Sequence, residues 1–485
     1  MKLLILIFLV PLCLIAQPKS EIVIGDVSHK IDAYLTQLTT DKSYSGGLLI
    51  LKGNEIIFSK GYGWANKEEK IPFTSGTLAS MGSITKAFTA AAILKLYQEK
   101  KLSLKDSLKK FFPAIPEDKQ AITIHQLLTH SGGFIEYLQG DQGDYEKLET
   151  ELFLSRCFTQ PLAFKPGTKA IYSNVGMSVL GVIIEKVTGL DYEAYLKKEF
   201  FQPNDIHIGY HFPNATNLSI AHGYQNGKDW GTIPGHFEKA GGGPYWNLKA
   251  NGGLEASLED IAKWANAISN KRILPDSLIA KMFTAQMQEE GYEGTSFFGY
   301  GCNVTKSRRG TKMIDNGGSN GIYHARMIRL PEEGLLFYMV TNENSINTNQ
   351  VLPNVTQLYF DGTIARDFTA TKFNNPMMNK LYSLLTEKDP ASFESILKEQ
   401  NITIDDDMIL YEVGQKLTNE NKTKEAIALY KYYTTAFPKI IVAWNDLGEI
   451  YLNQGNKMEA KKCFETALLL RPGNPRAAEN LKKIK

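Results

Sequence analysis

The sequence predicts an α+β protein that continues into a region of helical repeats. Residues Tyr44–Lys60 contain two apolar runs joined by Gly53-Asn54, a signal for two antiparallel strands in a tight hairpin. Long apolar stretches that begin near Ser83 and near Asn174 are typical of buried helices. From about Phe373 onward the pattern is helical, with few strand signals.

Length and charge set limits on the possible functions. The chain has 485 residues, which is enough for two or three domains. Its 54 basic and 52 acidic residues give a net charge of +2, so nothing indicates nucleic acid or an anionic membrane surface as a partner.

The first 16 residues, Met1–Ala16, have the pattern of a secretory signal peptide. One lysine is followed by a short apolar run and by a small residue before Gln17. The run is too short to span a bilayer comfortably, and no later stretch is long and apolar enough to do so. A lipoprotein attachment at Cys13 is the alternative, although Leu12 stands where a small residue is expected. We therefore expect an exported protein, periplasmic or secreted, with no transmembrane segment after cleavage.

The spacing of the cysteines does not predict a metal site. Cys157, Cys302 and Cys463 are far apart and lack the spacing of metal ligands. We expect them to be small buried side chains, and we expect neither a metal nor another cofactor.

The most informative stretch is Leu78–Leu96, because Ser83 and Lys86 stand three residues apart at the start of an apolar helix. Residues at i and i+3 share a helix face, so the hydroxyl and the amine can meet. Burial favours a neutral lysine, which can take the serine proton and so create a nucleophile. The helix N-terminus would stabilise the negative charge that develops.

Outside the hairpin and the two apolar helices the pattern is mixed. Ile31–Leu38, before the hairpin, predicts an amphipathic helix, and Gly61–Ala65 predicts an extension of the second strand. Leu104–Pro116 is expected as a surface connection, and Ile122–Leu128 as a helix. His130 follows in a loop with glycines, where a histidine is more often a structural hydrogen-bonding group than a catalytic base.

A second set of candidate residues is Tyr172-Ser173-Asn174, at the junction between a loop and an apolar helix. A tyrosine hydroxyl near a serine–lysine pair can relay protons to a leaving group. The asparagine amide can hold either the lysine or an amide of the substrate.

Five motifs, in this order, resemble the serine β-lactamase and penicillin-binding-protein superfamily, in its class C-related branch. They are GSITKAFTA, ITIHQLLTHSGG, FKPGTKAIYSNVGMSVLG, NGGLEASLEDIAKW and FGYGC, and the resemblance covers about 22–361. It implies an antiparallel sheet flanked by helices, plus an all-helical lobe, with the site between them. It also implies acylation of Ser83, proton transfer by Lys86 and Tyr172, and substrate positioning by Asn174.

The chain departs from the third motif of that superfamily, where a Lys or His is followed by a small polar residue and Gly. The matching residues are Asp315, Asn316, Gly317 and Gly318, which we expect to bind substrate. The Gly318 N–H would form an oxyanion hole with the Ser83 N–H. If Asp315 lines the cleft, it would repel a substrate carboxylate and favour an ester, a neutral amide or a free amine. The alternatives are that Asp315 caps a turn elsewhere, or that a nearby cation compensates: Arg308, Arg309, Lys312 or Arg326.

Two further stretches have a predicted role. Gly235–Gly253 is expected as a long loop, serving either as a lid on the cleft or as packing. Trp444, Leu447, Gly448 and Tyr451 begin a pattern that resembles a tetratricopeptide repeat, and a related pattern lies 34 residues earlier. Because two repeats bury little on their own, we expect them to dock on the rest of the chain or on a protein partner.

The sequence therefore predicts a signal peptide (1–16), a hydrolase domain (17–365) and a repeat region (366–485). The expected function is an exported serine hydrolase that forms an acyl-enzyme with an ester, amide or peptide, as a small-molecule or peptide substrate. Peptidase or esterase activity is favoured over β-lactamase activity. The alternative is a non-catalytic sensor that presents its repeats to a partner.

Overall fold

The computed structural model describes residues 21–484, apart from 43, 213–218, 226, 293, 308, 345–347, 364–375, 405–406 and 473. The expected signal peptide, the expected boundary at 365/366 and Arg308 lie outside the described residues.

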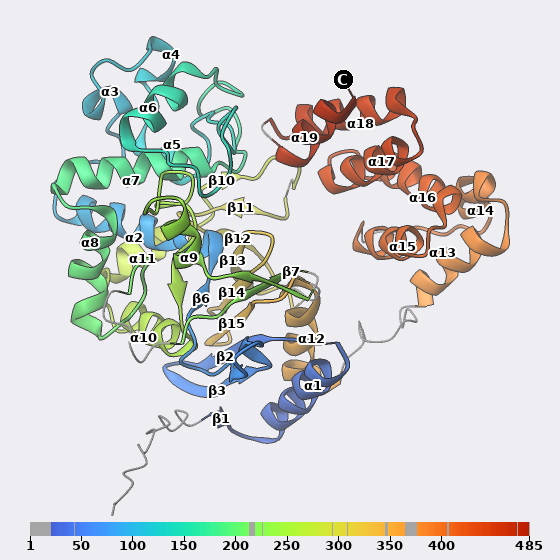
Figure 1. Cartoon of the computed structure of the whole chain (residues 1–485), viewed down its shortest axis with the longest axis horizontal. Helices are drawn as coiled ribbons and strands as arrows, with labels where there is room; N and C mark the ends of the chain where they lie inside the picture. Colours follow the sequence, from blue (N-terminus) through green and yellow to red (C-terminus); the bar gives the residue numbers. More distant parts are fainter. Residues whose placement is uncertain are drawn as a thin grey trace, which may run out of the picture.

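A nine-stranded antiparallel sheet forms the centre of the molecule, in the order β1-β3-β2-β15-β14-β13-β12-β11-β10 (Figure 1). The predicted hairpin is confirmed, with Gly53 and Asn54 forming its turn. The strands are β1 (Ile22–Val23), β2 (Gly46–Lys52), β3 (Glu55–Tyr62), β10 (Met287–Gln288), β11 (Phe297–Phe298), β12 (Asn303–Lys306), β13 (Lys312–Ser319), β14 (His324–Leu330) and β15 (Leu335–Thr341).

Three short two-stranded pairs lie outside this sheet. They are β4 (Trp64–Asn66) with β5 (Ile71–Pro72), β6 (Ala79–Ser80) with β9 (Glu255–Ala256), and β7 (Gly223–Gln225) with β8 (Lys228–Gly231). The predicted continuation of the hairpin is therefore interrupted, because β3 ends at Tyr62 and β4 begins at Trp64.

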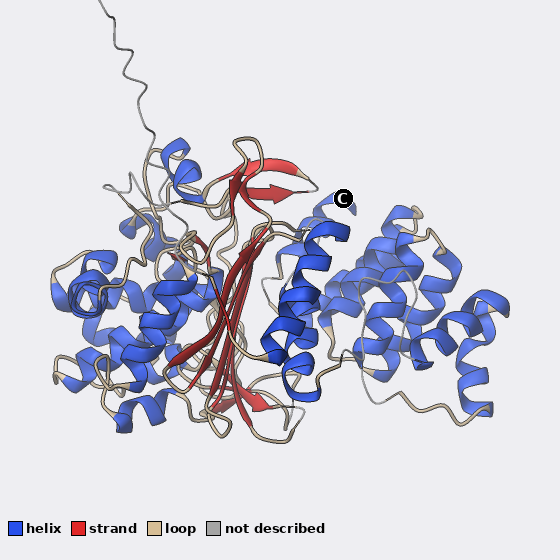
Figure 2. Ribbon diagram, turned by 90° about the horizontal axis from the view of Figure 1, so that it is seen from below, coloured by secondary structure: helices blue, strands red, loops and turns tan. Residues whose placement is uncertain are grey.

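Helices cover both faces of the sheet, as Figure 2 shows. On one face α1 (Asp26–Lys42) and α12 (Thr348–Asp361) pack against Phe337 and Met339 of β15. On the other face the helical lobe packs against Tyr338 and Val340. This alternation explains why β15 is buried along its whole length and is apolar from Leu335 to Val340, since a strand covered on both faces buries every side chain.

The helical lobe contains most of the remaining helices of the first part. They are η1 (Gly82–Ile84), α2 (Thr85–Gln98), α3 (Leu108–Phe111), α4 (Glu117–Gln120), α5 (Ile124–Leu128), α6 (Thr150–Thr159), α7 (Asn174–Thr188), α8 (Tyr192–Leu196), η2 (Lys197–Phe201), η3 (Gln202–Asn204), α9 (Ile233–Lys239), α10 (Leu258–Ser269) and α11 (Asp276–Met282). Two expectations need correction. The surface connection at Leu104–Pro116 contains α3, and the loop expected at Gly235–Gly253 begins inside α9, which Thr232 caps.

The C-terminal region is a stack of helices with its own apolar core. Gly414 faces the ring of Tyr430, and Gly448, 34 residues later, faces the ring of Phe464 in the same way. A side chain at either glycine would collide with that ring, which explains the repeated glycine. The helices are α13 (Pro376–Glu387), η4 (Pro390–Ser392), α14 (Phe393–Glu399), α15 (Asp407–Asn419), α16 (Thr423–Ala436), α17 (Ile441–Asn453), α18 (Lys457–Leu470) and α19 (Pro475–Ile484).

Three expectations concern the chain as a whole. The α+β prediction, with a helical lobe and a repeat region, is confirmed. Within the described ranges, no helix has the length and apolar character needed to cross a bilayer. The three described cysteines are buried and unpaired.

Glu255 of β9 carries a buried carboxyl group. It is paired with Ser80 of β6, two residues before η1. Both of its oxygens are buried, and neither has a hydrogen-bond partner among the described residues. Burial raises the pKa of Glu255 to about 8, so the group is protonated in the folded protein at neutral pH. The unfolded chain ionises the same group above its ordinary pKa of 4.5. Folding therefore takes up a proton in this range, and stability falls as the pH rises.

We predict that Glu255→Gln stabilises the protein progressively between about pH 4.5 and 8. The gain relative to the parent should grow by roughly 1.4 kcal/mol per pH unit, because glutamine needs no proton to be neutral. Urea unfolding at pH 4, 6 and 8 measures this. An equal difference at all three values would contradict a buried neutral carboxyl.

Candidate active site

Ser83 lies in η1, between β6 and α2. Hydrogen bonds fix this turn: Met81 N donates to Leu254 O (2.9 Å), and Thr85 Oγ1 donates to Gly82 O (2.7 Å). The next turn begins α2, whose apolar side chains are buried on nearly every side. Lys86 stands at the predicted i+3 position and is only 2% exposed.

The Lys86 amine has three polar neighbours. Its Nζ lies 3.0 Å from Ser83 Oγ, 2.6 Å from Asn174 Oδ1 and 2.6 Å from the Asn251 carbonyl oxygen. The last two can only accept hydrogen bonds. A neutral amine has two N–H groups and one lone pair, so donation to both oxygens directs the lone pair toward the Ser83 hydroxyl. The arrangement suits a general base.

Burial, with a smaller contribution from the charge of Arg471, lowers the pKa of Lys86 to about 7. The nearby carboxyl groups of Glu136 and Asp144 act in the opposite direction. A substantial fraction of the amine is therefore neutral at physiological pH.

Tyr172 reaches the same serine from the other side. It precedes α7, and its hydroxyl lies 2.6 Å from Ser83 Oγ, while Lys86 Nζ lies 4.7 Å from the centre of its ring. Burial raises the pKa of Tyr172 above its ordinary value of 10, although Ser83 and Arg471 oppose this. The phenol therefore keeps its proton at neutral pH and can donate it.

His130 supports this tyrosine. Its ring lies 4.9 Å from the Tyr172 ring, and its Nδ1 accepts a hydrogen bond from Ser173 N (3.1 Å). Burial and the charge of Lys86 lower the pKa of His130 to about 3, so the imidazole stays neutral. This geometry is that of the structural hydrogen-bonding group expected from the sequence.

Two backbone segments approach each other closely beside Ser83. A Cβ on Gly318 would lie 2.0 Å from Met81 O and 2.9 Å from Ser83 N. A Cβ on Gly82, whose φ is +50°, would lie 2.5 Å from Ser319 N. Only glycine allows this approach. The pairing of β12 with β13 ends at Asp315, so the Gly318 backbone lies on a strand edge next to η1.

The structure does not bring Asp315 into the cleft. Asp315 of β13 is paired with Ile328 of β14, and paired residues on neighbouring strands point to the same face of a sheet. Ile328 belongs to the core under α1 and α12, so the carboxylate of Asp315 points to the face away from Ser83. There Arg326 binds it with two hydrogen bonds, of 3.0 and 2.7 Å. The expectation of a negative charge from Asp315 at the substrate is not met.

Asn316 and Gly317, which were expected to bind substrate, do not line the cleft either. Asn316 faces the helical lobe, is 5% exposed, and donates from Nδ2 to Gly301 O (2.6 Å). This bond holds the FGYGC turn, which packs on the backbone of Lys86. Gly317 shares the face of Asp315, opposite Arg326.

A small pocket opens in front of Ser83 and contains residues that the sequence did not suggest. Its lining residues are Ser80, Gly82, Ser83, Tyr137, Asp144, Asn174, Ile233, Asn247, Leu248, Asn251, Gly252, Gly253, Ser319 and Asn320. Asp144 supplies a carboxyl group, and burial together with the charge of Asp141 raises its pKa to about 6. It has no hydrogen bond or ion pair within the described part of the chain. Neither motif nor periodicity marked Asp144, because it lies in an irregular polar loop.

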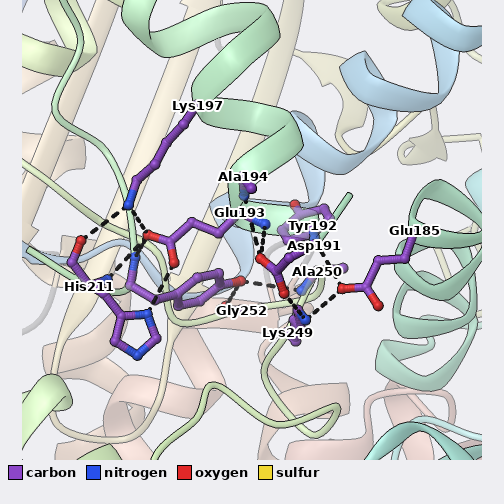
Figure 3. Close-up of polar contacts among 11 residues, drawn as sticks. Glu185, Asp191, Tyr192, Glu193, Ala194, Lys197, His211, Lys249, Ala250 and Gly252 are labelled. Atoms are coloured by element: carbon purple, nitrogen blue, oxygen red, sulfur yellow. Dashed lines mark hydrogen bonds and ion pairs between the residues drawn. The ribbon is translucent and has the colours of Figure 1, made fainter. Parts of the chain in front are cut away.

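The loop Lys249–Gly252, which presents the Asn251 oxygen to Lys86, is fixed by the polar network in Figure 3. Lys249 Nζ contacts Asp191 Oδ2 and Glu185 Oε1 at 2.5 Å each. Tyr210 accepts a hydrogen bond from Ala250 N and donates one to Gly252 O (3.0 Å). The predicted loop of Gly235–Gly253 therefore contributes to the floor of the site at its C-terminal end.

No group of three or more His, Cys, Asp or Glu side chains suited to a metal ion is present in the described parts of the chain. The site consists of Ser83, Lys86, Tyr172 and Asn174, which the structure brings together as the sequence predicted, with Asn251 as an unpredicted fifth member.

Comparisons with known proteins identify the family of the chain. The family profile "Beta-lactamase" matches residues 31–356, and the profile "Tetratricopeptide repeat" matches 441–474. A D-aminopeptidase of Gluconobacter oxydans is 27% identical over 308 residues, covering 62% of this chain and 56% of the relative. Penicillin-binding protein 4* of Bacillus subtilis is 23% identical, covering 64% and 70%.

Among solved structures, the octameric penicillin-binding protein homologue from Pyrococcus abyssi is similar. It has a TM-score of 0.61 and 26% identity, and the match covers 74% of this chain and 82% of that one.

We predict that acylation of Ser83 by an activated ester rises with pH, with a midpoint near pH 7. The protonated amine cannot accept the serine proton, so the rate should fall on the acid side of the Lys86 pKa. Lys86→Met should lower the rate by roughly 10²–10⁴-fold at pH 8. Burst kinetics with p-nitrophenyl acetate measure both effects. A rate that is flat from pH 5 to 9 would show that Lys86 is not the base.

Proposed function

Because the chain belongs to the beta-lactamase family, we propose that it is a serine hydrolase that works through an acyl-enzyme on Ser83. The observation that carries this proposal is the pair of short contacts at one hydroxyl, with Lys86 at 3.0 Å and Tyr172 at 2.6 Å.

In the proposed mechanism Lys86 is the base and Tyr172 is the acid. Lys86 takes the Ser83 proton as Oγ forms a bond to the substrate carbonyl carbon. The backbone N–H groups of Ser83 and Gly318 stabilise the oxyanion. Tyr172 then protonates the leaving amine or alkoxide as its bond to carbon breaks. This leaves an ammonium at Lys86 beside a phenolate, and proton transfer between them resets the site before water releases the acyl group.

For the substrate we propose a small amide or peptide with a free amino group near the scissile bond. A relative named D-aminopeptidase supports an amide, and the charge of the pocket supports the amine. Asp144 lines the pocket beside Ser83, lacks a cation of its own within the described residues, and is mostly ionised above pH 6. A charged amine would therefore pair with it.

We also propose export of the chain, on the pattern of Met1–Ala16. Expression of the full sequence with mass analysis of the mature N-terminus tests this, and a mature chain that begins at Gln17 is the expected result.

The first test uses three probes: a p-nitrophenyl ester, a fluorophosphonate and a labelled penicillin. Turnover or covalent mass at Ser83 that disappears in Ser83→Ala is the result expected of a serine hydrolase. The absence of modification by every probe would contradict it and favour the non-catalytic sensor.

The second test concerns Asp144. We predict that the p-nitroanilide of alanine is cleaved roughly tenfold faster than its N-acetyl form at pH 7.5, because only the free amine pairs with the carboxylate. The preference should disappear in Asp144→Asn, while cleavage of an uncharged ester continues. Equal preference in the parent and the variant would place the amine elsewhere.

A further inference from the structure

The end of the repeat region reaches the active site. Arg471 directly follows α18, and its Nε lies 2.6 Å from Glu136 Oε2. The same guanidinium lies 5.7 Å from the centre of the Tyr172 ring. Figure 1 shows how this is possible, because the repeat region curves back until α18 and α19 approach β10 and β11.

Arg471 is not a lone contact between the two parts. A Cβ on Gly291, in the turn between β10 and β11, would lie 3.7 Å from the carbonyl oxygen of Lys439, just before α17. In α19, the positive charge of Lys482 acts on the Asp141 carboxyl and lowers its pKa against the effect of burial. Arg471 and Lys439 therefore contact two different parts of the chain, Glu136 of the lobe and the β10–β11 turn of the sheet, and Lys482 is near enough for its charge to act on Asp141.

Glu136 connects Arg471 to the catalytic residues. Its carbonyl oxygen accepts a hydrogen bond from Asn174 N (3.1 Å), so it lies beside the start of α7. Its side chain is 6% exposed, and an unpaired carboxylate at that depth would be costly. Arg471 is the cation paired with it, and this pair lies between the repeats and the Lys86–Tyr172 pair.

We propose that Arg471 is a positioning residue of the hydrolase site, and that the repeat region supplies the cation that balances Glu136 beside Lys86 and Tyr172. This inference rests on the proposed function. It assigns the last repeat a part in the chemistry, in addition to packing on the lobe.

The charged and titratable groups near this cluster come from several elements. The charges of Glu136 and Asp144 raise the pKa of Lys86, and the charge of Arg471 lowers it. His130, next to Lys86, stays neutral. The charge of Arg471 also lowers the pKa of five other groups, against the effect of burial. They are Glu136 and Tyr137 in the α5–α6 loop, Glu289 and Tyr292 between β10 and β11, and Tyr172 before α7.

The signs of the expected effects follow from charge. Glu136→Gln removes an anion near Lys86, which should make the ammonium less stable and lower the pKa of Lys86. Removal of Arg471 alone is a weaker experiment. Without its cation the buried Glu136 carboxylate would take up a proton, so the positive and the negative charge would be lost together and their effects on Lys86 would cancel. In the Glu136→Gln background this response is blocked, so Arg471→Gln removes only the cation and should raise the pKa of Lys86.

The experiment compares four full-length proteins: the parent, Glu136→Gln, Glu136→Gln/Arg471→Gln and Arg471→Lys. The pH profile of kcat/KM for p-nitrophenyl acetate is measured from pH 5 to 9. The acid midpoint should fall in Glu136→Gln and rise again in the double variant, by roughly half a pH unit or more in each step. On the acid limb this corresponds to about threefold in rate. Arg471→Lys, which keeps the charge, should keep the parental midpoint.

A second measurement does not depend on turnover. Trace labelling with acetic anhydride, read by mass spectrometry, reports the pKa of the Lys86 amine in each protein, and it should show the same shifts. A protein with no Ser83-dependent turnover but with these shifts would contradict the proposed function alone. Midpoints that are equal in Glu136→Gln and the double variant, in both measurements, would overturn the role of Arg471.

Arg476→Gln is the matched control within the repeats. Arg476 binds Asp446 (2.7 Å) and Glu449 (2.6 Å) inside the repeat region, so its loss should lower the stability of the repeats. The midpoint of the pH profile should stay at the parental value. An equal shift in Arg476→Gln and in the Arg471 variants would show that the repeats act only by packing.

Discussion

The proposed chemistry of this protein depends on a buried amine that is held between two oxygens. Asn174 Oδ1 and Asn251 O each lie 2.6 Å from Lys86 Nζ, and together they determine where the lone pair of the neutral amine points. The rest of the lobe keeps these two oxygens in place. Ser173 caps α7 and so fixes Asn174, while the contacts of Lys249 and Tyr210 fix the loop of Asn251.

The charged side chains near the pocket fall into two groups, one on each side of the sheet. Asp315 and Arg326 neutralise each other on the face away from Ser83 and leave the cleft without their charge. In the lobe, Asp144 lines the pocket, and Glu136 forms an ion pair with Arg471 beside Tyr172. In the proposed mechanism the site is therefore acidic where a substrate would enter, and a cation balances the charge where the proton would be transferred.

The sequence was sufficient for the parts of the site that are local. Ser83 and Lys86 meet because three residues along a helix form one turn, and Tyr172 and Asn174 flank the start of another apolar helix. The antiparallel hairpin and the repeat pattern were equally local. The face of Asp315 was not, because it depends on the pairing of β13 with β14, and a shift of one residue would reverse it.

Asp144 and Arg471 were out of reach of sequence reasoning for a different reason. Asp144 lies in an irregular loop with no periodicity, and Arg471 lies in the repeat region, far along the chain from its partner Glu136. The short helix α9 was also missed, since its glycine and proline resemble a loop, although Thr232 caps it.

The position of β2 beside β15 has a consequence for how the protein is made. The first long strand of the chain forms its central pairing with the last strand of the sheet, from Leu335–Lys52 to Thr341–Gly46. A ribosome-bound chain cannot close this sheet until residue 341 has emerged, so the N-terminal hairpin waits with one edge unpaired during synthesis. Such distant pairing slows folding and exposes the waiting edge to aggregation. A chaperone that holds the nascent chain would therefore matter more for this protein than for one whose sheet is built from neighbouring strands.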